Sequence, residues 1–168
     1  MKLETIKIGQ IVNAHGIRGE LRIQPRDADP HFMTRFKTFL LDGAPVTPTS
    51  LHVHKSLVLM KLPGVEDMNA ALALKGKPLY VRRADAHLDE GEYFDDELLG
   101  LLVRSHATGE PLGELVRVDS YPAHKVYTVR GTREYLIPSG DDVFIKSIDL
   151  EDNVMTVQVW EGMATDEN

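Results

Sequence analysis

The chain has 168 residues, a formal net charge of −7 and no cysteine. The missing cysteines exclude disulfides, thiolate metal sites, iron–sulfur clusters and cysteine nucleophiles. No apolar run is long enough for a signal peptide core or a membrane span, so we expect a cytoplasmic protein with no membrane partner.

Alternation of polar and apolar residues predicts strands along the first half. In residues 18–24, Leu21 and Ile23 point inward, and Arg18, Glu20, Arg22 and Gln24 point outward. Further strands are predicted at Thr5–Gly9, Phe39–Leu41, Leu51–Val53, Leu57–Leu62 and Leu79–Arg82, with Gly43, Pro45 and Pro48 as breaks between them.

One short helix is predicted in this half. Val65, Met68 and Leu72 recur at helical spacing, Glu66 and Asp67 occupy the first turn, and Gly76 ends the helix.

The second half begins after a charged stretch with little periodicity, residues 84–92. Strands are predicted at Leu99–Arg104, Leu112–Asp119, Lys125–Arg130, Glu134–Ile137 and Val154–Val159. Gly131-Thr132 suits a two-residue hairpin turn, and Thr108 to Pro111 a looser turn. The predicted fold is all-β: two small β-barrels joined by a short linker. Its parts are residues 1–84, a linker at 85–92, a second barrel at 93–164 and a frayed tail at 165–168.

The charge of the chain is divided between these halves. Residues 1–86 carry 13 Lys and Arg against 8 Asp and Glu, a net charge of +5. Residues 87–168 carry 6 against 18, a net charge of −12. Charge concerns partners rather than fold, so the division predicts two unlike partners, a polyanion for the first half and a basic protein for the second.

Motifs for catalysis and for metal binding are missing from the sequence. It has no Walker loop, no Gly-x-Gly-x-x-Gly and no Gly-x-Ser-x-Gly. His52 and His54 share a strand face without further ligands, and Ser139 to Asp142 is typical of a turn. The acidic group Asp89, Glu90, Glu92, Asp95, Asp96 and Glu97 lacks the pattern of a calcium loop. We expect no enzyme activity, no cofactor and no metal.

Two other groups of residues allow binding. An outward strand face is predicted to carry Arg18, Arg22 and Arg26, with Lys7 and Arg35 near them. These residues are equally compatible with phosphate contacts and with a solvated charged face that binds nothing. Tyr93-Phe94 are adjacent aromatics beside acidic residues. Because neighbouring side chains cannot both face one core, two arrangements are equally compatible with the sequence. Either one ring is exposed as an interface anchor, or one ring packs in the barrel and the other against the linker.

Three ordered blocks of the chain resemble the RimM family of ribosome maturation factors. The first is Ile8 to Leu21, IGQIVNAHGIRGEL. The second is Glu92-Tyr93-Phe94 followed by Leu98 to Val103 and Leu112-Gly113, and the third is Leu136-Ile137-Pro138, Ile148-Asp149-Leu150 and Glu161-Gly162-Met163. With Leu74-Lys75-Gly76 and Arg82, the blocks extend over nearly the whole chain.

The resemblance implies a translation-factor-like barrel followed by a PRC-type barrel. It also implies a non-enzymatic, monomeric factor for late assembly of the small-subunit head and for 16S rRNA processing. Its expected partners are a basic head ribosomal protein of the uS19 type, held by Tyr93, Phe94, Asp95 and Asp96, and the immature small subunit with its 16S rRNA.

The expected contact with rRNA or the particle involves His15, Gly16, Arg18, Gly19 and Arg22. The two glycines of this loop are compatible with a contact loop or with a tight connection. Outside the resemblance, a catalytic or small-molecule-binding barrel and a simple RNA-binding module remain alternatives.

The chain departs from the family pattern at three places. Phe94 stands where the second ring is usually Tyr, Glu97 where Asp is usual, and His124-Lys125 where an Asn-Asp pair is usual. The ring contact is expected to survive at Phe94, without a hydroxyl hydrogen bond.

Overall fold

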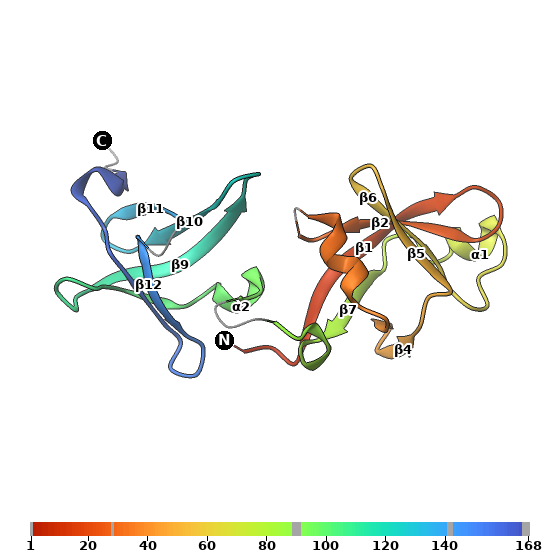
Figure 1. Cartoon of the computed structure of the whole chain (residues 1–168), viewed down its shortest axis with the longest axis horizontal. Helices are drawn as coiled ribbons and strands as arrows, with labels where there is room; N and C mark the ends of the chain where they lie inside the picture. Colours follow the sequence, from red (N-terminus) through yellow and green to blue (C-terminus); the bar gives the residue numbers. More distant parts are fainter. Residues whose placement is uncertain (1, 28, 89–91, 141–142, 166–168) are drawn as a thin grey trace. The chain divides into compact units, whose positions relative to one another are not determined.

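The computed structural model describes residues 2–27, 29–88, 92–140 and 143–165. It divides into two compact units. One is Glu4–His87, and the other joins Leu88–Asn168 with the first residues, Met1–Leu3 (Figure 1). The all-β fold class is confirmed, because each unit is a seven-stranded sheet curved around its own core. No helix in the described ranges is long and apolar enough to cross a bilayer.

The sheet of the first unit has the strand order β4-β3-β7-β1-β2-β6-β5. Its strands are β1 (Thr5–His15), β2 (Glu20–Pro25), β3 (Phe39–Leu41), β4 (Ala44–Val46), β5 (Ser50–His54), β6 (Leu57–Lys61) and β7 (Pro78–Arg82). Alternate residues of the strands fill the core, among them Ile6, Ile8, Leu21, Ile23, Val58, Met60, Leu79 and Val81. The predicted inward positions Leu21 and Ile23 are therefore confirmed.

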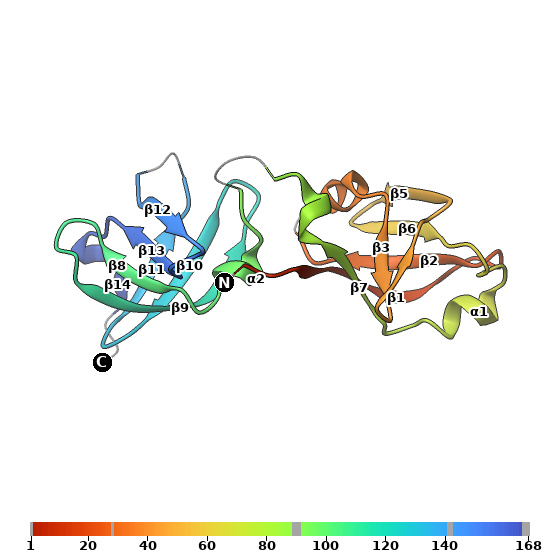
Figure 2. The ribbon, with the colours of Figure 1, turned by 90° about the horizontal axis from the view of Figure 1, so that it is seen from below.

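Short helical segments connect these strands. They are the 3-10 helix η1 (Pro30–Arg35), the α-helix α1 (Met68–Leu72) and the 3-10 helix η2 (Arg83–Ala86). Asp67 caps α1, since its carboxylate accepts from the backbone N–H of Ala70 at 2.8 Å. The predicted short helix is present as α1, but the residue that it buries is Ala71, whereas Met68 and Leu72 are about 40 % exposed. Figures 1 and 2 both show α1 beside the turn that joins β1 and β2.

The sheet of the second unit has the order β12-β13-β8-β9-β10-β11-β14. Its strands are β8 (Leu102–Ser105), β9 (Pro111–Ser120), β10 (Lys125–Arg130), β11 (Glu134–Pro138), β12 (Ile145–Asp149), β13 (Val154–Val157) and β14 (Ala164–Thr165). The α-helix α2 (Asp95–Leu98) precedes them, and the 3-10 helix η3 (Glu161–Met163) precedes β14. Strands β8 and β13 are parallel, and the other paired strands are antiparallel.

The centre of this second core is formed by Leu101, Val103, Leu115, Val129, Ile137, Met155 and Val157.

Two glycines allow the backbones of this unit to approach each other closely. A Cβ on Gly113 would lie 2.4 Å from the carbonyl oxygen of Arg130, and one on Gly131 would lie 2.2 Å from that of Leu112. Side chains at either position would force these backbones apart.

Several local predictions differ from the structure. Pro45 is not a break but lies inside β4, at the edge of its sheet, where a missing N–H is tolerated. Leu99 to Leu101 are not strand residues, because the chain turns from α2 into β8 there. The β10–β11 loop has three residues rather than two, since Arg130 pairs with Glu134.

The predicted linker and tail are partly ordered. Residues 84–86 belong to η2, with Ala86 buried, while 89–91 lie outside the described residues. At the other end of the chain Thr165, in β14, pairs with Glu134 of β11, and residues 166–168 lie outside the described residues.

Candidate partner-binding surfaces

The turn between β1 and β2 is built on two glycines. Gly16 and Gly19 have φ angles of +73° and +89°, a region that side chains disfavour. Gly19 also packs against the backbone: a Cβ there would lie 2.1 Å from the carbonyl oxygen of Val65, just before α1. Nothing lies within 4 Å of the same position on Gly16. The turn therefore rests on the α1 segment through Gly19 and exposes Ile17, which is 74 % accessible.

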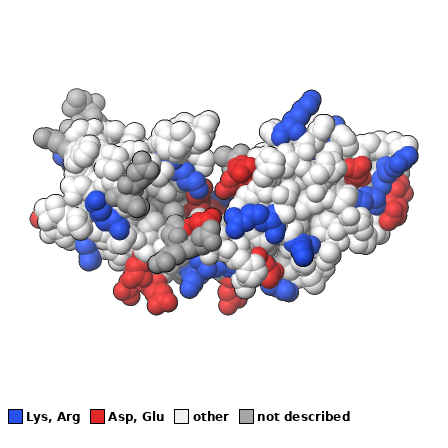
Figure 3. All heavy atoms as spheres, in the orientation of Figure 1, with Lys and Arg blue, Asp and Glu red and all other residues white. Residues whose placement is uncertain are grey.

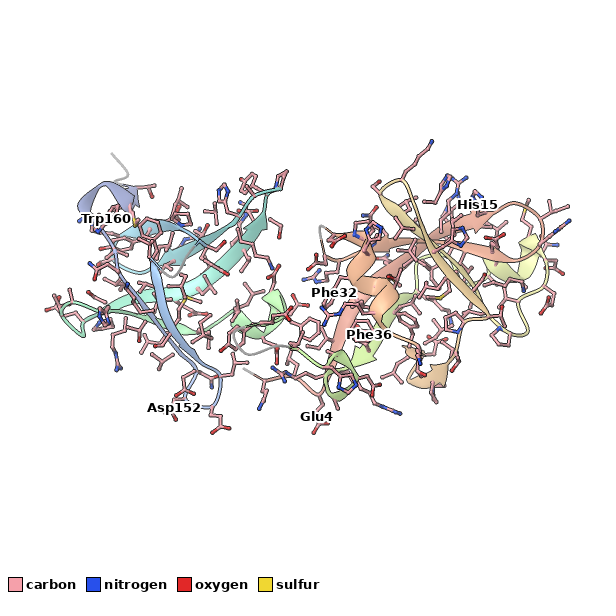
Figure 4. The ribbon with its side chains drawn as sticks, viewed as in Figure 1. Glu4, His15, Phe32, Phe36, Asp152 and Trp160 are labelled. Atoms are coloured by element: carbon pink, nitrogen blue, oxygen red, sulfur yellow. The ribbon has the colours of Figure 1, made fainter. Side chains whose placement is uncertain are left out.

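His15, at the end of β1, joins two neighbouring side chains. The Arg22 guanidinium donates from Nε to His15 Nδ1 at 3.1 Å. The ring centroids of His15 and His54 are 5.8 Å apart. Figure 4 labels His15 in this unit. We call His15, Arg22 and His54 the imidazole–arginine cluster; the sequence showed His54 only as a solvated strand position.

Strand pairing places His52 on the row that contains Arg22. Arg22 pairs with Leu59 of β6, and Leu59 pairs with His52 of β5. Paired residues project on the same side of a sheet, so Arg22 and His52 flank the buried Leu59 on one face. This face offers ring nitrogens and a guanidinium, which suit contacts to phosphate oxygens.

The predicted row of Arg18, Arg22 and Arg26 on one strand face is wrong. Only Arg22 lies within β2; Arg18 belongs to the glycine turn before the strand, and Arg26 follows its end. Lys7 and Arg35 are engaged elsewhere in the unit: Lys7 Nζ donates to Gln10 at 3.3 Å, and Arg35 lies over the Phe32 ring at 5.1 Å.

Tyr93 and Phe94, the predicted aromatic pair, are both largely covered. Phe94 is only 8 % exposed. Tyr93 packs against the second core, and its hydroxyl donates to the carbonyl oxygen of Ile148 at 3.3 Å. Of the two arrangements compatible with the sequence, the one with a fully exposed ring is not the one seen in the unbound chain.

The acidic residues after this pair form the short helix α2. Asp95 accepts from Lys125 Nζ at 2.6 Å, with both side chains about one-third exposed, and Asp96 is half-buried. Glu97 is fully buried, and its carboxylate accepts from the backbone N–H groups of Leu3 at 3.2 Å and Phe94 at 3.4 Å. Glu97 thus has a structural role. Asp89 and Glu90 lie outside the described residues.

Lys125 and Asp95 also influence Tyr127, two residues along β10. Burial raises the pKa of the Tyr127 hydroxyl above its usual value; the Lys125 charge lowers the pKa, and the Asp95 charge adds to the rise.

Two exposed aromatic side chains were missed from the sequence. Tyr121, in the β9–β10 turn, is 53 % exposed and stacks on His124. Trp160, which Figure 4 labels, is 58 % exposed. Its ring packs edge-on against Phe144. Single aromatic residues in turns carry no periodic signal, so only the structure separates these rings from core aromatics.

Charges of both signs are visible on both units in the face drawn in Figure 3. The net charges of +5 and −12 counted along the chain are thus differences between mixed surfaces. A net charge of this kind steers encounter with a charged partner, while the local contacts determine where the partner binds.

Comparison with known proteins assigns the two units to one family. Residues 6–86 match the RimM N-terminal domain, and residues 95–163 match the RimM PRC barrel domain. The chain is 34 % identical to the ribosome maturation factor RimM of Geobacter metallireducens, over 95 % of each chain, and 34 % identical to that of Symbiobacterium thermophilum, over 97 % of this chain and 96 % of the relative. A crystal structure of a putative 16S ribosomal RNA processing protein RimM from Pseudomonas aeruginosa is 26 % identical, covers 94 % of this chain and 98 % of its own, and has a TM-score of 0.46. The sequence matches to both domains, in order and over nearly the full length, show that this chain belongs to the RimM family of ribosome maturation factors.

Proposed function

We propose that this chain is a non-enzymatic assembly factor for the head of the small ribosomal subunit that also aids 16S rRNA processing. The observation that carries the proposal is the ordered match of both units to RimM domains. In this proposal the chain acts as a cytoplasmic monomer, uses no cofactor and has no catalytic residue.

The first unit is proposed to contact rRNA of the immature particle through His15, Gly16, Arg18, Gly19 and Arg22. The net charge of +5 over residues 1–86 supports a polyanionic partner. The imidazole–arginine cluster supports contacts to the RNA backbone, because its groups come from β1, β2 and β5 and lie on one sheet.

The second unit is proposed to bind a basic ribosomal protein of the uS19 type through Tyr93, Phe94, Asp95 and Asp96. The net charge of −12 over residues 87–168 favours encounter with a basic protein and disfavours RNA. Since Phe94 is 8 % exposed, we assign it a positioning role beneath the partner surface, with Asp95 and Asp96 closer to the partner.

Co-sedimentation with immature small subunits tests this proposal. The full chain is compared with an Asp95→Asn/Asp96→Asn double variant, and a pull-down with purified uS19-type protein is run in parallel. The matched control is Glu151→Gln/Asp152→Asn, which removes two charges from an exposed turn of the same unit (Asp152 is labelled in Figure 4).

The proposal expects the first double variant to lose binding to the protein and to sediment less with the particle, while the control keeps both. Retention of both interactions by the Asp95/Asp96 variant would contradict the assigned protein site. If the chain does not sediment with immature small subunits at all, the assembly role is wrong.

A further inference from the structure

The turn between β9 and β10 presents an aromatic pair that lies outside the sites proposed above. The backbone N–H of Tyr121 donates to the carbonyl oxygen of His124 at 2.8 Å, which closes the turn. Within it the two rings stack, with centroids 5.6 Å apart and planes inclined by 24°. Tyr121 remains 53 % exposed, so one side of its ring is supported and much of the rest is open to solvent.

The next residue ties this turn to α2. Lys125, adjacent to His124, donates from Nζ to Asp95 at 2.6 Å. Its backbone N–H donates to Ser139 Oγ at 2.8 Å, and its carbonyl oxygen accepts from the Ser139 backbone at 2.8 Å. The turn that carries Tyr121 is therefore anchored, through Lys125, to α2 and to Ser139.

Trp160, the other strongly exposed ring, lies at the opposite end of the same barrel. Trp160 follows the end of β13. Strand β13 runs parallel to β8, and β8 runs antiparallel to β9, so β13 and β9 end at opposite ends of the barrel. Tyr121 follows the end of β9. The two rings have similar exposures, 53 % and 58 %, so Trp160 is a matched reference for a test of Tyr121.

We infer that Tyr121, supported by His124, is the exposed aromatic contact through which the second unit binds a basic protein. Aromatic side chains are enriched at interface centres and pair with arginine, and a guanidinium binds favourably over a tyrosine ring. The net charge of −12 in this half selects a partner rich in Arg and Lys over a nucleic acid. In the unbound chain Phe94 is 8 % exposed and Tyr93 is half-buried with its hydroxyl bonded to Ile148, so both rings are less open to a partner than Tyr121. The inference rests on the proposed function, whose protein partner it shares.

The test measures binding of full-length variants to purified uS19-type protein by calorimetry at fixed ionic strength. We expect Tyr121→Ala to weaken binding at least tenfold, which corresponds to about 1.4 kcal/mol, because a central aromatic contact is lost. Tyr121→Phe keeps the ring and should bind within about twofold of the wild type, and Trp160→Ala should do the same. Because Tyr121 is exposed, its variants are expected to fold, which circular dichroism verifies.

Photocrosslinking gives a second measurement that does not depend on affinity. A benzoyl-phenylalanine placed at position 121 is expected to crosslink to the basic protein, and the same residue at position 160 is not. Wild-type-like binding by Tyr121→Ala, or a crosslink from position 121 to rRNA instead of protein, would overturn the inference while leaving the assembly role intact. Failure of the wild type itself to bind the protein would instead contradict the proposed function.

Discussion

Replacement of Glu97 tests whether a buried carboxylate holds the second unit together. Its side chain is fully buried and accepts from the backbone N–H groups of Leu3 and Phe94. Leu3 belongs to the same compact unit although 94 residues separate it from Glu97. The carboxylate therefore joins the start of the chain to α2.

The size of the effect follows from these two contacts. In Glu97→Gln one of the two N–H groups faces an amide nitrogen and loses its acceptor. A lost hydrogen bond to a charged group costs about 1.5–3 kcal/mol, so we expect the unfolding free energy to fall by about 2 kcal/mol. Glu97→Ala removes both acceptors and leaves a cavity, and about 3–5 kcal/mol is expected. Either loss is a large part of the stability of a small domain.

Urea denaturation followed by tryptophan fluorescence isolates this unit, because Trp160 is the only tryptophan in the chain and lies within it. Glu151→Gln is the control, since Glu151 is exposed and its loss should change stability by less than about 0.5 kcal/mol. If Glu97→Gln also stays within about 0.5 kcal/mol of the wild type, the carboxylate does not have the role assigned to it.

Three further outcomes are expected. Gly19→Ala should lower the unfolding free energy of the first unit by at least about 2 kcal/mol more than Gly16→Ala, because only Gly19 faces a backbone oxygen, at 2.1 Å; circular dichroism melting of both variants measures this, and equal losses would contradict it. Because burial raises the pKa of Tyr127, its hydroxyl is protonated in both the folded and the unfolded chain below pH 10, the usual tyrosine pKa, and does not change the unfolding free energy there. Above pH 10 the hydroxyl ionises first in the unfolded chain, so the unfolding free energy should fall. Urea titrations between pH 9 and 11 test this, and Tyr127→Phe should remove this contribution. Arg22→Ala should reduce the slope of log binding constant against log salt for 16S rRNA fragments by about 1, whereas Lys37→Ala should leave it unchanged; an unchanged slope in Arg22→Ala would remove Arg22 from the RNA surface.

The strands were predictable because the alternation of polar and apolar residues indicates which face of a sheet is buried. The boundaries of β10, Lys125–Arg130, agree with the predicted ones, and Leu21 and Ile23 are both buried. β4 was missed because Pro45 indicates a break by itself, and only its position at a sheet edge allows it in a strand. The four residues of α2 are too few for helical periodicity to appear.

The surfaces were less predictable, because they depend on contacts between distant residues. His54 meets His15 only through the order of β1, β2, β6 and β5. Phe94 is covered and Tyr121 exposed, although both are aromatics beside charged residues in the sequence. Charge could be counted from the sequence, but the pairing of Asp95 with Lys125 could not.

The central claim is that the two units bind partners of opposite charge. Crosslinking of the full chain bound to immature small subunits, followed by mass spectrometry, tests it most directly. We expect RNA crosslinks within Glu4–His87 and crosslinks to a basic ribosomal protein within Leu88–Asn168. RNA crosslinks concentrated in the second unit, or the basic protein crosslinked to the first, would contradict the claim.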